Sequence, residues 1–299
     1  MRKSNLLLLI LSLLVFEKIY SQNFTIIDSV TRKPIPFVAV LLKQEGKILY
    51  GNYCNQNGEA FIKEDEVFDT VEFSCIGYKS KSIDKFNLKK EMVVTLAEEV
   101  YKLDEVIISS KLFDSYKIIG YLNENKTSYE WKGNGETTLF IENESKDVTQ
   151  IISILFKIRK VKSRSAYRVH FYKKMESHFH PGERLINEDI IGFIEPDTKG
   201  IIELDISQYA LQFPIEGMFL SIEPLGFTNE KEITKQRDNG LFFEFHQTKK
   251  NIYFHRISFS PENWDNVNER LVKDYIYLGK EKVPSKNLIA PSFGIKIIR

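Results

Sequence analysis

The chain has 299 residues, and its 42 lysines and arginines nearly balance 41 aspartates and glutamates, for a formal charge of +1 at pH 7. Because no long block carries a single sign of charge, nucleic acid is not expected as a partner. Aromatic residues make up 13% of the chain, which favours β-structure, since such side chains suit a pleated, half-buried surface. The length predicts two domains at about 150 residues each.

The first 21 residues have the order of regions that export requires. Two basic residues precede an apolar run, Leu6–Phe16, and a short polar stretch follows. This order predicts a secretory signal peptide over residues 1–21, with Gln22 first in the mature chain. The apolar run is too short for a bilayer, which needs roughly 20 residues of helix. We therefore expect an exported protein, periplasmic, outer-membrane-associated or at the cell surface, with no transmembrane segment after cleavage.

Residues 22–97 alternate between short strand patterns and turn chemistry. Seven such strands at this spacing are typical of an antiparallel β-sandwich, transthyretin-like or immunoglobulin-like. The pair Asn57 and Gly58 predicts a tight turn. Gly77 ends the strand of "VEFSCIGY", and there we expect a turn or a close approach that a Cβ would block. The strand candidates are residues 23–28, 34–42, 47–54, 59–63, 70–78, 79–83 and 91–97.

Cys54 and Cys75 are the only cysteines of the chain. Export permits a disulfide between them. Cys75 also shares the parity of Val71 and Phe73 in one strand, which fits a small apolar core residue equally well. Because pairing requires Cα atoms within about 7 Å, the sequence leaves both interpretations open.

Three motifs in residues 22–97 occur in a recognisable order. They are "DSVTRKPIPFVAV" at Asp28–Val40, "NQNGEAFI" at Asn55–Ile62 and "FSCIGY" at Phe73–Tyr78. Together they resemble the carboxypeptidase-regulatory-like domain of Bacteroidetes cell-envelope proteins. The resemblance implies a transthyretin-like β-sandwich without catalytic residues of its own.

Residues 98–114 are expected to be a linker or the first strand of the next domain. Within them "LDEVIIS", residues 103–109, resembles the TonB box of TonB-dependent outer-membrane receptors. Only 190 residues follow this segment, too few for a barrel of many strands, each about 10 residues long. A transporter is therefore not expected.

Residues 115–299 show many strand patterns and no strong helical periodicity, which predicts a larger all-β domain. The run from Tyr167 to Leu225 resembles a second module of uncharacterised Bacteroidetes proteins, and it implies a jelly-roll-like sandwich. The strand candidates are residues 128–132, 137–142, 150–159, 166–174, 200–206, 217–223, 241–247, 252–258 and 294–299.

The segment from Glu176 to Glu183 contains a possible metal-binding motif. His180 and Glu183 fit His-x-x-Glu, which supplies two zinc ligands in zinc carboxypeptidases, and Glu176 and His178 lie beside them. A zinc site needs three or four ligands on a suitable scaffold. We interpret the segment as a polar hairpin loop with Pro181-Gly182 as its turn. No catalytic, cofactor-binding or metal-binding residue is assigned.

Other chemistry-bearing patterns are weaker still. Nucleophile motifs and phosphate-binding glycine loops are absent from the sequence, and "KGNGET", residues 132–137, is interpreted as a turn. Trp131 and Trp264 fit either a sugar-stacking platform or the core. Five carboxylates alternate with apolar residues, which predicts a solvated strand face; they are Glu203, Asp205, Glu216, Glu223 and Glu244.

These observations predict an exported, non-enzymatic protein of the cell envelope that acts by binding or scaffolding. It uses no cofactor, and its partner is an envelope protein or a glycan. One alternative is a carbohydrate-binding protein that uses the aromatic residues of the C-terminal domain. The other is a metal-dependent hydrolase centred on the segment from His178 to Glu183.

Overall fold

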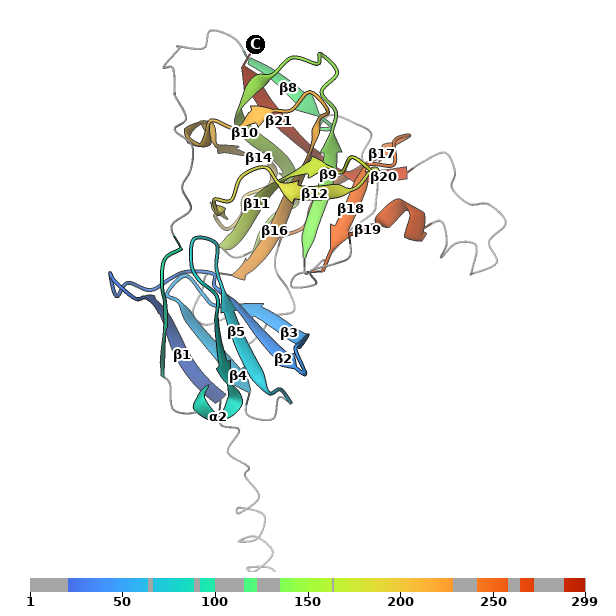
Figure 1. Ribbon diagram of the computed structural model, residues 1–299. Coiled ribbons are helices and arrows are strands. Elements are labelled where there is room, and N and C mark those ends of the chain that lie inside the picture. The colour runs from blue at the N-terminus through green and yellow to red at the C-terminus, as the bar shows by residue number, and fades with distance from the viewer. Residues whose placement is uncertain are drawn as a thin grey trace, which may run out of the picture. The chain divides into compact units, whose positions relative to one another are not determined.

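The computed structural model is all-β, as predicted, with strands joined by loops and short helical turns (Figure 1). The structure describes residues 21–63, 67–88, 92–99, 116–122, 135–162, 164–227, 241–257, 264–271 and 288–298. Nearly all of the expected signal peptide, the segment 103–109 and most of the expected linker lie outside these residues. The chain divides into two compact units, Met1–Glu99 and Val100–Arg299. Among the described residues, no helix has the length and apolar character that a membrane crossing needs.

The first unit contains two sheets, ordered β4-β1-β7 and β3-β2-β5-β6. One strand overlaps each of the seven predicted windows. The predicted antiparallel pattern is wrong for one pair, because β1 and β7 run in parallel. The elements are β1 (Ser21–Asp28), β2 (Ala39–Gln44), β3 (Lys47–Tyr53), β4 (Glu59–Lys63), β5 (Thr70–Ser74), β6 (Lys81–Asp84), α2 (Lys85–Leu88) and β7 (Val93–Leu96).

The core of the first unit follows from period-2 alternation in its strands. In β5 Val71 and Phe73 are fully buried, while their neighbours are half-buried. The ring of Phe73 meets that of Phe24 from β1 edge to face, with 5.4 Å between centroids. Because these residues belong to different sheets, the contact joins the two layers. Each such buried side chain contributes about 1.5–3 kcal/mol.

Gly58 and Gly77 of the first unit both have the positive φ angles that turns require. Gly58 has φ +72°, and a Cβ there would lie 2.5 Å from the carbonyl oxygen of Ile26. Gly77 has φ +82°, but nothing lies within 4 Å of its Cβ position. The turn expected at Gly77 is confirmed, and a close approach of backbone occurs at Gly58 instead.

Cys54 and Cys75 do not form a disulfide in the structure, because both remain thiols. Cys54 is buried, and its Sγ atom accepts a hydrogen bond of 3.0 Å from the backbone N–H of Val38. It behaves as a small core residue rather than as half of a disulfide.

The described residues of the second unit form three sheets, ordered β14-β10-β21-β8, β12-β11-β16-β9-β18-β19 and β17-β20. In addition, β15 pairs with β10, and β13 pairs with β11. The elements are β8 (Tyr116–Gly120), β9 (Glu136–Ile141), β10 (Thr149–Ile158), β11 (Ser165–Lys174), β12 (Pro181–Arg184), β13 (Ile190–Ile194), β14 (Gly200–Asp205), η1 (Ser207–Tyr209), β15 (Gln212–Phe213), β16 (Met218–Phe227), β17 (Phe245–Thr248), β18 (Tyr253–Arg256), β19 (Asp265–Asn266), β20 (Leu288–Pro291) and β21 (Phe293–Ile298).

The core of this unit lies between the sheet that contains β10 and the sheet that contains β11. Phe156 of β10 packs edge to face on Tyr167 of β11, with centroids 4.9 Å apart, and on Phe293 of β21 at 6.2 Å. Tyr167, Val169 and Phe171 therefore form the inner face of β11. Residues of the other parity point to the opposite side, which we call the outer face of this sheet.

The hairpin predicted at Pro181-Gly182 is wrong in its details. Both residues belong to β12, where Pro181 pairs with Lys174 of β11. The connection between the strands therefore covers residues 175–180. Six further strands lie outside the predicted windows, namely β8, β12, β13, β15, β19 and β20. The predicted strand at residues 128–132 lies outside the described part of the chain.

Candidate functional site: a buried polar cluster

Charged side chains lie next to one another on the outer face of the sheet that contains β11. Strand register places Arg168 of β11 opposite Glu223 of β16, and Glu136 of β9 opposite Arg256 of β18. His170 lies on the same face, two residues beyond Arg168, because side chains alternate between the faces of a strand. Four neighbouring strands thus bring charges of both signs together.

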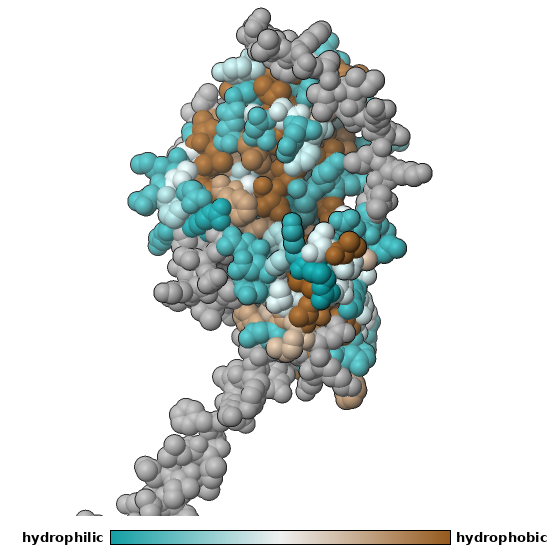
Figure 2. All heavy atoms as spheres, turned by 90° about the vertical axis from the view of Figure 1, so that its left-hand side faces the viewer, coloured by the Kyte–Doolittle hydropathy of each residue, from teal (hydrophilic) through white to brown (hydrophobic). Residues whose placement is uncertain are grey.

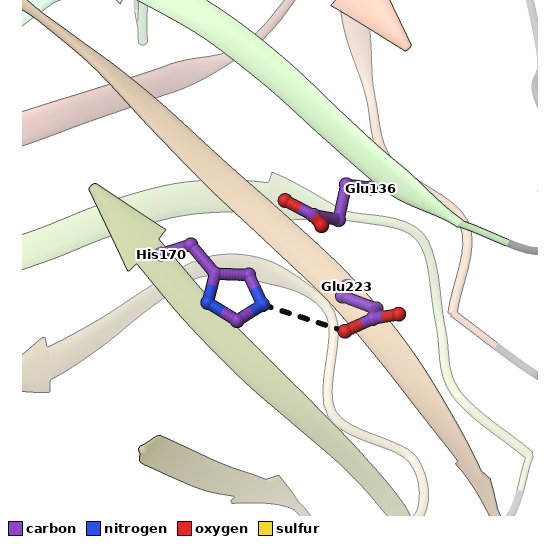
Figure 3. Close-up of side chains that lie close together, drawn as sticks. All are labelled: Glu136, His170 and Glu223. Atoms are coloured by element: carbon purple, nitrogen blue, oxygen red, sulfur yellow. Dashed lines mark hydrogen bonds and ion pairs between the residues drawn. The ribbon is translucent and has the colours of Figure 1, made fainter. Parts of the chain in front are cut away.

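Glu136, His170 and Glu223 approach one another from three neighbouring strands (Figure 3). The Nε2 atom of His170 lies 3.4 Å from the Oε2 atom of Glu223. Ligand atoms of all three residues lie within 4.8 Å of one another. Each residue is at most 4% exposed. Among the described residues, no other group of three His, Cys, Asp or Glu gathers this closely.

Hydrogen bonds hold both carboxylate oxygens of Glu136. Its Oε2 atom accepts hydrogen bonds from the hydroxyl groups of Tyr172 at 2.6 Å and Ser221 at 2.9 Å. Its Oε1 atom is ion-paired with Arg256. Arg256 also donates to the Tyr172 hydroxyl at 2.9 Å, and its guanidinium lies 4.4 Å from the ring centroid of Trp264. The carboxylate is therefore held by side chains of three other strands, β11, β16 and β18.

Arg168 connects a third carboxylate to the group. Its Nε atom lies 3.1 Å from Oδ1 of Asp189, and its Nη1 atom lies 3.7 Å from Oε2 of Glu223. With three carboxylates and two guanidiniums, the group carries a formal charge of −1 when the imidazole of His170 is neutral. We call it the polar cluster; it comprises Glu136, Arg168, His170, Asp189, Glu223 and Arg256.

The charges of the cluster decide its protonation. Burial by itself raises the pKa of Glu136, but the positive charges of His170 and Arg256 outweigh this effect and hold the pKa below its usual value. Burial lowers the pKa of Arg256, yet Glu136 and Tyr172 raise it overall. Burial and the charge of Glu136 raise the pKa of Tyr172. At pH 7 the carboxylate and guanidinium are thus charged, and the phenol remains a hydrogen-bond donor.

Aromatic side chains cover the neighbouring part of the outer face. Phe140, Phe219 and Phe254 come from β9, β16 and β18. Phe179, from the connection between β11 and β12, packs on all three, with ring centroids 4.9, 5.6 and 6.0 Å away. On the same sheet, β11 is buried on both faces from Ser165 to Tyr172.

The four residues of the predicted polar loop do not form a site. Glu176 and His178 are exposed, and so is Glu183 on β12. His180 is half-buried with its ring 4.9 Å from that of Phe254, and burial followed by the charge of His178 lowers its pKa. No three of these four bring ligand atoms together in the described part of the chain.

The prediction of a solvated strand face is confirmed for Glu203 and Asp205, which are exposed on β14, whereas Glu216 is exposed but lies in the turn between β15 and β16. Glu244 is half-buried. For Glu223 the prediction is wrong, because the residue is 3% exposed and belongs to the polar cluster. Alternation alone does not reveal whether another layer covers the polar face of a strand.

Two other candidates have mixed outcomes. In the predicted turn 132–137, residues 132–134 lie outside the described part, and Glu136 begins β9 rather than lying in the turn. Trp264 is half-buried between Tyr172, with ring centroids 5.1 Å apart, and Arg256. Trp131 lies outside the described residues.

Sequence reasoning missed the polar cluster. The one signal it offered is in "AYRVHFYKK", where Arg168, His170 and Tyr172 alternate with Val169 and Phe171. Each of these three side chains combines a large apolar part with a polar end. Such residues on one face of a strand indicate a covered face more than lysines and glutamates do.

The comparisons with known proteins add no identification. No protein-family model matches the chain, and no curated protein matches it. The class of molecule that the structure defines is an all-β chain of two compact units, the second of which carries a buried polar cluster.

Proposed function

We propose that this is an exported, non-enzymatic protein of a bacterial cell envelope that acts by binding or scaffolding. Its first unit is a transthyretin-like, carboxypeptidase-regulatory-like domain, and its second unit is a jelly-roll-like sandwich. The order of basic, apolar and polar regions in residues 1–21 supports export. The three ordered motifs between Asp28 and Tyr78, together with the two sheets of the first unit, support the domain assignment.

The burial of the polar cluster is the main support for the proposal that the protein is not an enzyme. A catalytic group must reach a bound substrate, but Glu136, His170 and Glu223 are at most 4% exposed. Their charged and polar atoms already contact Arg168, Arg256 and other groups of the same sheet. Such an arrangement favours a rigid frame over a reaction centre.

The surface supports a binding role. Large apolar side chains are exposed on both units, with Phe86 70% exposed in the first and Ile201 48% exposed in the second. Figure 2 shows one face of the molecule on which hydrophobic side chains gather in patches between hydrophilic ones. Patches of this kind, rimmed by polar residues, are typical of contact surfaces for other macromolecules. The partner proposed is therefore another envelope protein.

The two alternatives have less support. A glycan platform needs accessible rings, whereas Trp264 is engaged by Arg256 and Tyr172. A hydrolase centred on His178 and Glu183 needs a third ligand, and none gathers there among the described residues.

Cell fractionation of the source organism, followed by mass spectrometry of the native protein, tests the proposal. We expect a mature N-terminus at Gln22 and recovery with the envelope. A chain that keeps Met1 in the cytosol contradicts export. In parallel, the purified protein is incubated with a model peptide, with and without zinc. We expect no C-terminal trimming, and zinc-dependent trimming that His180→Ala and Glu183→Gln abolish contradicts the non-enzymatic role.

A further inference from the structure

One pair of atoms in the polar cluster has the spacing of metal ligands, and a third ligand atom lies nearby. Two ligands bound to a tetrahedral ion at about 2.0–2.1 Å lie about 3.4 Å apart, and 3.4 Å separates Nε2 of His170 from Oε2 of Glu223. The ligand atom of Glu136 lies within 4.8 Å of both. Closing the triangle around an ion then requires the Glu136 side chain to move by at most about 1.4 Å, the difference between 4.8 and 3.4 Å. The three side chains converge in Figure 3.

The surroundings of these residues resemble an outer coordination shell. Metal-bound carboxylates and imidazoles are normally oriented by further hydrogen bonds, which tune metal affinity. Tyr172 and Ser221 donate to Glu136 through their hydroxyl groups, and Arg256 pairs with its other oxygen. Arg168 lies beside Glu223. Both carboxylates are thus held in place by neighbours that are not ligands themselves.

We propose that Glu136, His170 and Glu223 bind one zinc ion, which joins β9, β11 and β16 as a structural cross-link. Two oxygen ligands and one imidazole nitrogen suit zinc, whereas magnesium and calcium favour oxygen ligands alone. Burial of all three ligands favours a structural role over a catalytic one.

The test uses the purified full-length protein, stripped with EDTA and returned to metal-free buffer at pH 7.5. We measure bound zinc after equilibrium dialysis and the unfolding midpoint with and without zinc, with magnesium as the comparison ion. The expected result is one equivalent of zinc and a midpoint raised by about 5 °C or more at saturation, with no such effect of magnesium.

Three variants locate the ion. His170→Asn and Glu223→Gln remove one ligand each while nearly keeping side-chain size, and both are expected to lose stoichiometric zinc. The matched control, a His178→Ala and His180→Ala double variant, removes the histidines of the neighbouring loop and is expected to bind as before. The proposal is overturned when the control loses zinc while the ligand variants keep it, or when the wild-type protein binds none.

Binding of cobalt(II) tests the site in the wild-type protein, so this test does not require that any variant folds. Cobalt(II) bound at a four-coordinate site has intense visible absorption. We expect this absorption in the wild-type protein at one equivalent of cobalt, with competition by zinc. Its absence at saturating cobalt overturns the proposed site, even where a ligand variant fails to fold.

Discussion

The two units bury different kinds of side chain. Among the described residues, Asp28 is the one buried polar residue of the first unit, and backbone and hydroxyl groups of its own turn hydrogen-bond to it. In the described part of the second unit, six glutamate, arginine and histidine side chains are buried besides neutral polar ones. They are Glu136, Arg168, His170, Glu223, His246 and His255.

This difference means that the two units depend on different interactions. Apolar contacts are not directional, so an apolar side chain needs no single specific partner. Buried charges stabilise a fold only as a complete set, since removing one partner leaves the other desolvated and uncompensated. We therefore expect the second unit to respond sharply to single charge changes and to acid, and the first to respond mainly to backbone changes.

The largest expected effect is that of Glu136→Ala. The substitution leaves Arg256 without its carboxylate and the hydroxyl groups of Tyr172 and Ser221 without their acceptor. Breaking a buried ion pair costs about 3–5 kcal/mol, and the lower end applies because Arg256 is partly exposed. Denaturant unfolding followed by tryptophan fluorescence reports on the second unit, since Trp131 and Trp264 both belong to it.

Glu203→Ala is the matched control for that variant. Glu203 is also ion-paired, with Lys296, but its side chain is 42% exposed. Exposed pairs contribute about 1 kcal/mol or less. Equal losses of stability for the two substitutions would mean that burial of charge does not distinguish the cluster from the surface.

Acid is expected to affect the second unit first, because all five histidines belong to it. Burial lowers the pKa of both His246 and His255 to about 4, against about 6.5 in the unfolded chain. Between these two values the unfolded state binds protons that the folded state does not, so stability falls as the pH decreases from 6.5 and the loss levels off below about pH 4. For one such histidine the loss at pH 5 is roughly 2 kcal/mol.

His246→Phe tests this dependence at one position. His246 is fully buried and stacks on Tyr121, with ring centroids 5.0 Å apart, and neither ring nitrogen has a hydrogen-bond partner within the described structure. A phenyl ring keeps the stacking and cannot titrate. The difference in stability between pH 7 and pH 5 should shrink by roughly 2 kcal/mol. If the stability difference between pH 7 and pH 5 does not change, groups other than His246 cause the acid response.

Hydrogen exchange followed by mass spectrometry compares the two units at acidic pH. It should show that amide protection is lost in the second unit before the first.

The strands and one turn of the first unit could be predicted from the sequence, because residues close together in the chain determine them. The alternation in "TVEFS" is enough to bury Val71 and Phe73, and the Asn-Gly pair is enough to place a turn. The polar cluster could not be predicted from local sequence patterns. His170 and Glu223 lie 53 residues apart, and Ser221 and Glu136 lie 85 apart, so only the strand register brings them together.

Burial of the cluster was harder still to predict. The same alternation that gives Glu203 an exposed position gives Glu223 a buried one. The pattern does not show what packs beside a strand, such as Trp264, which contacts Tyr172 and Arg256 and comes from a segment without a periodic pattern. A loop with Phe179 between two histidines was interpreted as polar, although its aromatic ring is what packs on the sheet.

A smaller effect is expected from two glycine substitutions in the first unit. Gly58→Ala and Gly77→Ala both place a side chain at positive φ, which costs about 1–2 kcal/mol. At Gly58 the new Cβ would also lie 2.5 Å from the carbonyl oxygen of Ile26, whereas space around Gly77 is open. We expect Gly58→Ala to lose about 1–2 kcal/mol more than Gly77→Ala in thermal unfolding. Equal losses would mean that backbone conformation alone decides the cost.

The smallest expected effect concerns the thiols of the first unit, where chemistry can change without a change in stability. Cys54 is 2% exposed and accepts the N–H of Val38, whereas Cys75 is half-buried. A thiol reacts only where reagent reaches it, so iodoacetamide should label Cys75 in the folded protein and Cys54 only after denaturation. Intact-protein mass spectrometry without reductant should then show one label before unfolding and two after it. Two labels that appear only after reduction would reveal a disulfide, and the apolar core around Cys54 would then be repacked rather than closed around a thiol.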